Sequence, residues 1–215
     1  MRTILALCMA AAGPLLAADG GAMNDAERAF LVSQMEQSKK AFLASIEGVT
    51  AAQWKFKPAP TVWSVAECAE HIILAEDYLF GASQGILKGE AVARPATSSA
   101  EQDQKLAAMV GDRSKKATAP EPIVPSGKFN TPEEAAKAFT ERRDKSLAYA
   151  RSTTDELRTH VTKGPLGMMD AYQMLLLMAT HTGRHTAQIR EVEANADYPK
   201  TVATGRVLAI PLATE

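Results

Sequence analysis

Four long stretches of the chain carry apolar side chains at helical spacing. They cover residues 24–47, 64–87, 131–153 and 170–194. In each stretch, apolar residues recur every three or four positions, which places them on one face of an α-helix. Four amphipathic helices bury their apolar faces most simply against one another. The pattern therefore predicts an all-α protein built as a four-helix bundle.

The starts of these helices are marked by capping residues. Ser64 and Glu67 form a capping box, in which each side chain accepts a hydrogen bond from the other residue's backbone N–H. Thr131 and Glu134 repeat the pattern, with Pro132 at the first helical position. We therefore expect the second and third helices to begin at these residues.

The connection over residues 89–130 is the longest between the predicted helices. It contains four prolines after Gly89, and only residues 100–110 are suited to a short helix. A turn between antiparallel neighbours needs far fewer residues. We therefore expect the second and third helices to run parallel, joined by a long crossover, which gives an up-down-down-up bundle. The loop before the fourth helix is expected to be irregular, with no strand before residues 206–212.

The first residues differ from the rest of the chain. A short positive start, an apolar run and the small pair Ala17-Ala18 are typical of a secretory signal peptide. A lipoprotein signal ending at Cys8 is the less favoured alternative, because bulky Leu7 precedes it. We expect a signal peptide over residues 1–18, the bundle over residues 24–199 and a tail over residues 200–215. The protein would then be exported to the periplasm or the exterior.

Charge and composition narrow the possible partners. The formal net charge is −1, with no dominant basic patch, so nucleic-acid binding is not expected. No apolar run after the signal peptide is long enough to cross a membrane. Cleavage would leave Cys68 as the one cysteine, so no internal disulfide is expected. Its thiol is either a buried core group, which we favour, or a group beside the functional site.

Three of the four histidines are the candidates for chemistry. His181 and His185 lie four residues apart on the fourth predicted helix, and therefore on one face of it. His71 lies on the second predicted helix. Three imidazoles can hold a divalent metal and leave coordination positions free, as in catalytic sites. The alternative for each residue is a hydrogen-bonded core histidine.

The segment from His181 to His185 differs from the zinc-protease motif. That motif needs Glu directly after the first histidine as a general base, and here the position holds Thr182. We therefore exclude a protease of that type.

Two segments together resemble the DinB-like (damage-inducible) superfamily of metal-binding four-helix bundles. They are residues 63–72, with sequence WSVAECAEHI, and residues 181–189, with sequence HTGRHTAQI; Tyr198-Pro199 resembles the close of the family's last helix. The resemblance implies an up-down-down-up bundle in which His71, His181 and His185 bind zinc or nickel, with water in the remaining positions. Some relatives are thiol transferases that use low-molecular-weight thiols such as bacillithiol or mycothiol.

Other residues near these histidines have two interpretations each. Glu67, one turn before His71, and Gln188, three residues after His185, are candidates to orient the imidazoles through hydrogen bonds. The alternatives are the capping role for Glu67 and a solvated position for Gln188. Trp63 is expected to fix the entry to the second helix rather than to wall the site. Arg142 and Arg143 are candidates to bind an anionic substrate, but we favour a solvated helix face for both.

Three functions remain open from the sequence. The first is a metal-dependent enzyme, a thiol transferase or hydrolase acting on a small-molecule substrate. The second is a non-catalytic metal-binding or stress-related protein. The third is a bundle without metal that serves in association. Formation of a homodimer is compatible with all three.

Overall fold

The computed structural model describes residues 20–200. The predicted signal peptide, and the predicted tail beyond Lys200, lie outside these residues. The described elements, in chain order, are α1 (Asp25–Ile46), α2 (Ala51–Lys55), α3 (Val65–Ile86), α4 (Ala100–Gly111), η1 (Glu121–Ile123), α5 (Pro132–Ser152), β1 (Val161–Gly164), β2 (Gly167–Asp170) and α6 (Ala171–Glu193).

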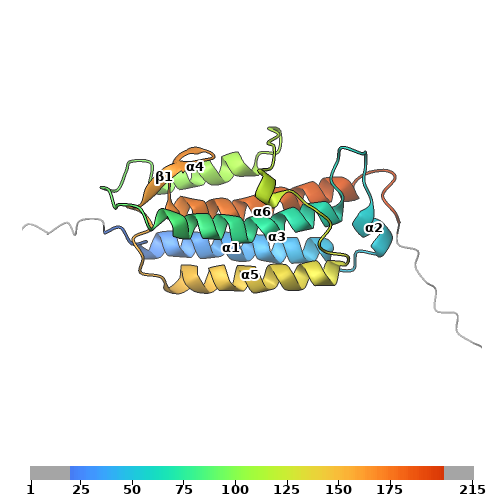
Figure 1. Ribbon diagram of the computed structural model, residues 1–215, viewed down its shortest axis with the longest axis horizontal. Helices are drawn as coiled ribbons and strands as arrows, with labels where there is room; N and C mark the ends of the chain where they lie inside the picture. The colour runs from blue at the N-terminus through green and yellow to red at the C-terminus, as the bar shows by residue number, and fades with distance from the viewer. Residues whose placement is uncertain (1–19, 201–215) are drawn as a thin grey trace, which may run out of the picture.

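The four long helices α1, α3, α5 and α6 lie side by side along the length of the molecule (Figure 1). Around the bundle, α6 packs against both α1 and α3, and α5 packs against the same two helices. The predicted four-helix bundle is thereby confirmed. The predicted helix starts also hold, because Ser64 and Thr131 cap α3 and α5 through their side chains.

Hydrogen bonds between the helices define their directions. Arg28, near the start of α1, donates to the carbonyl oxygen of Ala150, near the end of α5. Tyr172, at the start of α6, donates to the carbonyl oxygen of Glu27, at the start of α1. Thus α1 and α6 run in one direction while α5 runs in the other, as the colours in Figure 1 also show.

The segment between α3 and α5 lies along the bundle rather than away from it. In Figure 1 it crosses one side of the molecule, carrying α4 along α6 and η1 against α3. Leu106 and Val110 on α4 and Ile123 on η1 are buried in the same apolar cluster as the first half of α6. This connection therefore covers the two helices that carry the histidines.

The region before α6 differs from the prediction. Residues expected to form an irregular loop make an antiparallel hairpin, in which Val161 pairs with Asp170 and Gly164 with Gly167. Gly167 has φ +105, a conformation that favours glycine. The strands have only four residues each, too few for an alternating pattern to stand out from a loop. The expected strand at residues 206–212 lies outside the described part of the chain.

Two arginines are fully buried in the bundle, contrary to the expectation for one of them. Arg143 was expected on a solvated face, but it forms an ion pair with Glu76 in which the side chains are 0% and 2% exposed. Arg158 forms ion pairs with Glu27, Asp103 and Asp170 near the start of α6. A buried guanidinium needs such partners because its desolvation is costly.

Within residues 20–200, no helix is long and apolar enough to cross a membrane.

Candidate metal centre

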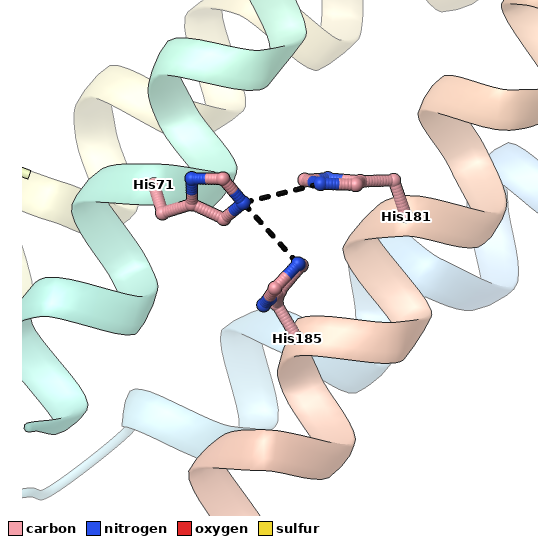
Figure 2. Close-up of side chains that lie close together, drawn as sticks. All are labelled: His71, His181 and His185. Atoms are coloured by element: carbon pink, nitrogen blue, oxygen red, sulfur yellow. Dashed lines mark hydrogen bonds between the residues drawn. The ribbon is translucent and has the colours of Figure 1, made fainter. Parts of the chain in front are cut away.

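The three predicted histidines meet between α3 and α6. His71 lies two turns into α3 and is 2% exposed, whereas His181 lies near the middle of α6 and His185 lies one turn after it. The start of α3 packs with the end of α6 in one apolar cluster and the end of α3 packs with the start of α6 in another, so the two helices run in opposite directions. Figure 2 shows the three rings pointing toward a common centre.

The ring nitrogens are spaced as metal ligands would be. Nε2 of His71 lies 3.1 Å from Nε2 of His181 and 3.2 Å from Nε2 of His185. One ligand atom from each of the three residues lies within 4.8 Å of the other two. Nitrogens bound to one tetrahedral zinc at 2.0–2.1 Å would lie about 3.3 Å apart. The cluster is therefore close to the size that a single cation requires.

The hydrogen bond on the far side of His71 fixes its tautomer. Its Nδ1 lies 2.7 Å from the carbonyl oxygen of Ile123, which can only accept a hydrogen bond. Nδ1 must therefore carry the proton, and Nε2 presents a lone pair to the centre of the cluster. A histidine ligand is commonly oriented in this way by a partner on its other nitrogen.

His185 is held in the same manner by Gln188. Its Nδ1 lies 2.8 Å from Oε1 of Gln188, and the same oxygen accepts a bond of 3.3 Å from Arg113. The guanidinium of Arg113 in turn forms an ion pair with Glu191. Because Oε1 faces the Arg113 donor, it acts as the acceptor for His185 as well, so Nε2 of His185 also presents a lone pair.

The tautomers make the cluster unfavourable without a cation. Nε2 of His71 and Nε2 of His185 are 3.2 Å apart, and neither carries a proton for the other. His181 can donate from its Nε2 to only one of them, and its buried Nδ1 has no hydrogen-bond partner among residues 20–200. A positive ion at the centre would bind all three lone pairs, so the donor set fits a divalent metal.

All three imidazoles are held neutral, as metal ligands must be. Burial lowers the pKa of His71, although the bond to Ile123 partly opposes this. Burial, followed by the neighbouring imidazoles, lowers the pKa of His181 well below its usual value. Burial also lowers the pKa of His185 to about 3. Each lone pair is therefore free for a metal at neutral pH.

Trp63 packs against the cluster. Its ring centre lies 4.8 Å from that of His71 and 6.1 Å from that of His185. Trp63 also packs against the apolar cluster that contains Cys68 of α3, so its contact with the histidines is compatible with the role expected at the entry to that helix.

Of the two residues expected to orient the imidazoles, only Gln188 bonds to one. Glu67 uses its carboxylate for the capping box with Ser64 and for an ion pair with Lys57. Within the described chain it makes no hydrogen bond to any of the three histidines. The capping role, given above as the alternative, is the role that the structure gives to Glu67.

The crossover provides orienting groups that the sequence did not indicate. These are the Ile123 carbonyl, which binds His71, and Arg113, which reaches His185 through Gln188. Arg184 holds the same segment by donating to the carbonyl oxygens of Val110, Asp112 and Lys115. A backbone carbonyl has no signature in a sequence, so no pattern could have located the first of these groups.

Glu70, next to His71 on α3, fixes another part of the crossover. Its carboxylate accepts hydrogen bonds from the backbone N–H groups of Ser126, Gly127 and Lys128. Burial raises the pKa of this carboxyl, but the backbone bonds together outweigh burial and the net pKa is lowered. Glu70 is therefore an ionised carboxylate bound to the loop that follows Ile123.

Cys68 belongs to the apolar core. Its side chain is 0% exposed and packs in the cluster that includes Ile72 and Ile189. Burial raises the pKa of its thiol to about 12. The thiol is not among the residues that could hold a metal in the described chain.

Fold and site together define a class: four-helix bundles that carry a three-histidine centre for a divalent metal. The sequence profile of the DinB superfamily matches residues 34–189 of this chain. The chain belongs to the DinB superfamily, as the two histidine segments indicated. A comparison with curated proteins gives no significant match.

The fold is also similar to a solved structure, that of YfiT from Bacillus subtilis. The two structures superpose with a TM-score of 0.54 at 16% sequence identity, over 80% of this chain and 88% of YfiT. YfiT is described as a probable metal-dependent hydrolase with an unusual four-helix bundle topology. At this level of identity, the likeness establishes a shared fold.

Proposed function

We propose that this protein is a metal-dependent enzyme that activates a small-molecule thiol for transfer to an electrophilic substrate. The observation that carries the proposal is the set of three neutral imidazoles whose Nε2 atoms converge, with the lone pairs of His71 and His185 turned inward by Ile123 and Gln188. Three ligands leave at least one coordination position free in a tetrahedral or larger shell. Zinc and nickel are the proposed metals, because imidazole suits both.

The residues of the chain have separate roles in this proposal. His71, His181 and His185 hold the ion, and Ile123 and Gln188 fix two of the three rings. Trp63 packs against the rings of His71 and His185. A divalent cation bound by three neutral ligands would keep its charge and lower the pKa of a thiol or water bound to it.

The carboxylates around the centre favour a thiol over water as the nucleophile. Hydrolysis by water is usually assisted by a free general base. The three glutamates of α3 and Glu191 of α6 are already bound to partners: Glu67 to Lys57, Glu70 to backbone N–H groups, Glu76 to Arg143 and Glu191 to Arg113. A thiol is more acidic than water and depends less on such a base.

Metal-dependent hydrolysis is the second candidate function. It is favoured by the similarity in fold to YfiT, which is described as a probable metal-dependent hydrolase. The two candidates share the metal centre and differ in the nucleophile. A panel of thiol and electrophile pairs, set beside a panel of esters and amides, separates them.

The test uses metal content and turnover together. Protein purified without added metal should contain close to one equivalent of zinc or nickel, and alanine at any of the three clustered histidines should abolish both metal and turnover. His160→Ala is the matched control, because this imidazole bonds to the Gly89 carbonyl and lies outside the cluster. Fully loaded protein without turnover in either panel would leave only a non-catalytic metal-binding role.

We also propose that the protein is exported, on the evidence of its first 18 residues. The low-molecular-weight thiols used by known thiol transferases of this family are mainly cytoplasmic, so an exported enzyme would need another thiol. N-terminal sequencing of the protein recovered from the periplasm or the medium should begin at Asp19. Recovery of uncleaved protein in the cytoplasm would reject export without affecting the metal site.

A further inference from the structure

The orientation of His71 depends on a loop as well as on its own helix. Its Nδ1 bonds to the Ile123 carbonyl, 52 positions along the chain. If this carbonyl moved away, the proton could transfer to Nε2, and the lone pair facing the other histidines would be lost. The position of Ile123 therefore affects whether His71 can act as a ligand.

The loop that carries Ile123 is bound to α3 by Glu70. The two carboxylate oxygens accept bonds from the N–H groups of Ser126 at 2.8 Å, Gly127 at 2.8 Å and Lys128 at 3.0 Å. The Ser126 hydroxyl adds a fourth bond at 3.1 Å. Glu70 is only 2% exposed, and these four hydrogen bonds compensate its buried charge.

We propose that Glu70 is a positioning residue of the metal centre. By holding residues 126–128 against α3, its carboxylate keeps the Ile123 carbonyl on Nδ1 of His71, and so keeps the Nε2 lone pair directed at the metal. The inference rests on the proposed metal site. It assigns to Glu70 an effect on metal affinity that neither helix capping nor core packing would produce.

The first test compares two glutamates on the same helix. Glu70→Gln keeps the side-chain volume but replaces one acceptor oxygen by an NH₂ group, which cannot accept a bond from a backbone N–H. Loss of a group that hydrogen-bonds to a metal ligand weakens metal binding by about 10–100-fold, and we expect Glu70→Gln to weaken zinc binding by this factor. Glu67→Gln is the control: it changes a carboxylate one helical turn before His71, and we expect unchanged affinity for zinc in a competition titration.

A second pair of variants leaves both glutamates in place. Gly127 has φ +85 and Gly48 has φ +70, and a Cβ at either position would meet no heavy atom within 4 Å. Gly127→Ala therefore strains the anchored loop through the backbone alone, and Gly48→Ala applies a similar strain at the end of α1. We expect Gly127→Ala to weaken zinc binding and Gly48→Ala to leave it unchanged. This pair decides the matter if Glu70→Gln does not fold.

A spectroscopic measurement separates positioning from general destabilisation. In the metal-free protein, the ring ¹⁵N shifts of His71 should show the Nδ1–H tautomer. Glu70→Gln and Gly127→Ala should show a mixture of tautomers, while the two controls keep the parent signals. An unchanged tautomer together with an unchanged zinc affinity in both variants would overturn the proposal.

The same data distinguish this inference from the proposed function. If the parent protein bound no zinc or nickel, the proposed function would fail, and the tautomer comparison would still test the role of Glu70. If the parent bound zinc and both variants bound it equally well with the parent tautomer, only the role of Glu70 would fail.

Discussion

The buried pair Glu76 and Arg143 allows a sharp prediction about stability. Nε and Nη2 of Arg143 lie 2.8 and 2.5 Å from the two oxygens of Glu76, and the side chains are 0% and 2% exposed. Glu76→Gln preserves the volume but leaves the guanidinium with no ionised partner. Breaking a buried pair in this way costs about 3–5 kcal/mol of the free energy of unfolding.

The size of the expected effect makes it easy to measure. A domain of this length loses about 2–4 °C in Tm per kcal/mol, so Glu76→Gln should lower Tm by about 6–20 °C. Thermal unfolding of the metal-free protein, followed by circular dichroism, gives Tm. Urea unfolding, followed in the same way, gives the free energy of unfolding. The metal must be removed, because ligand binding adds its own contribution to the apparent stability.

The neighbouring residue provides the matched control. Asp77 forms an ion pair with Arg142 on the same two helices, but these side chains are 64% and 32% exposed. Exposed pairs contribute about 0–1 kcal/mol, so Asp77→Asn should change Tm little. If Glu76→Gln were no more destabilising than Asp77→Asn, the argument from burial would be refuted.

Four further predictions concern the metal, the thiol and the response to acid. His71→Ala removes a metal ligand. It should weaken zinc binding by more than the loss of a hydrogen-bond partner of a ligand does, which is about 10–100-fold. Equal zinc affinity of variant and parent in a competition titration would exclude His71 as a ligand. Removing the metal with a chelator should lower the apparent stability by about 3 kcal/mol when the parent was measured at a hundred times its Kd, and an unchanged Tm would argue against a bound metal. Cys68, whose thiol pKa is raised to about 12 by burial, should not react with a thiol reagent until the protein unfolds; rapid labelling of native protein would contradict its position in the core. Burial raises the pKa of Glu27, but its bonds to Asn24, Arg158 and Arg94 outweigh burial and lower the pKa below 4.5. The ionised carboxylate therefore stabilises the protein above pH 4.5. This contribution is lost as the pH falls through the lowered pKa. Glu27→Gln should therefore destabilise the protein at pH 7 and progressively less toward acid pH in urea unfolding, and a pH-independent loss would be inconsistent with this account.

The helices were predictable because their signals are local. A capping box involves residues three apart, and Ser64 with Glu67 forms one in the structure as in the sequence. The spacing of His181 and His185 likewise follows from the period of a single helix. The hairpin at residues 161–170 was missed because its strands are too short to show a period.

The burial of Arg143 was missed for a different reason. Arg142 and Arg143 are equally polar in the sequence, and both lie on α5. The buried partner Glu76 lies 67 positions away and the exposed partner Asp77 lies 65 positions away. Which arginine is buried depends on how α3 and α5 meet, and that is not a local property of either segment.

The sequence by itself determined the four helices, their caps and the three histidines that can bind a metal, because each depends on side chains close together along the chain. Only the tertiary structure decided that His71 meets His181 and His185, and that the Ile123 carbonyl and the Glu70 carboxylate fix the metal centre from the crossover. These contacts join segments tens of residues apart, and several of them use backbone groups that every residue possesses. Hydrogen bonds of that kind arise from the packing of the bundle and cannot be read from the order of the residues.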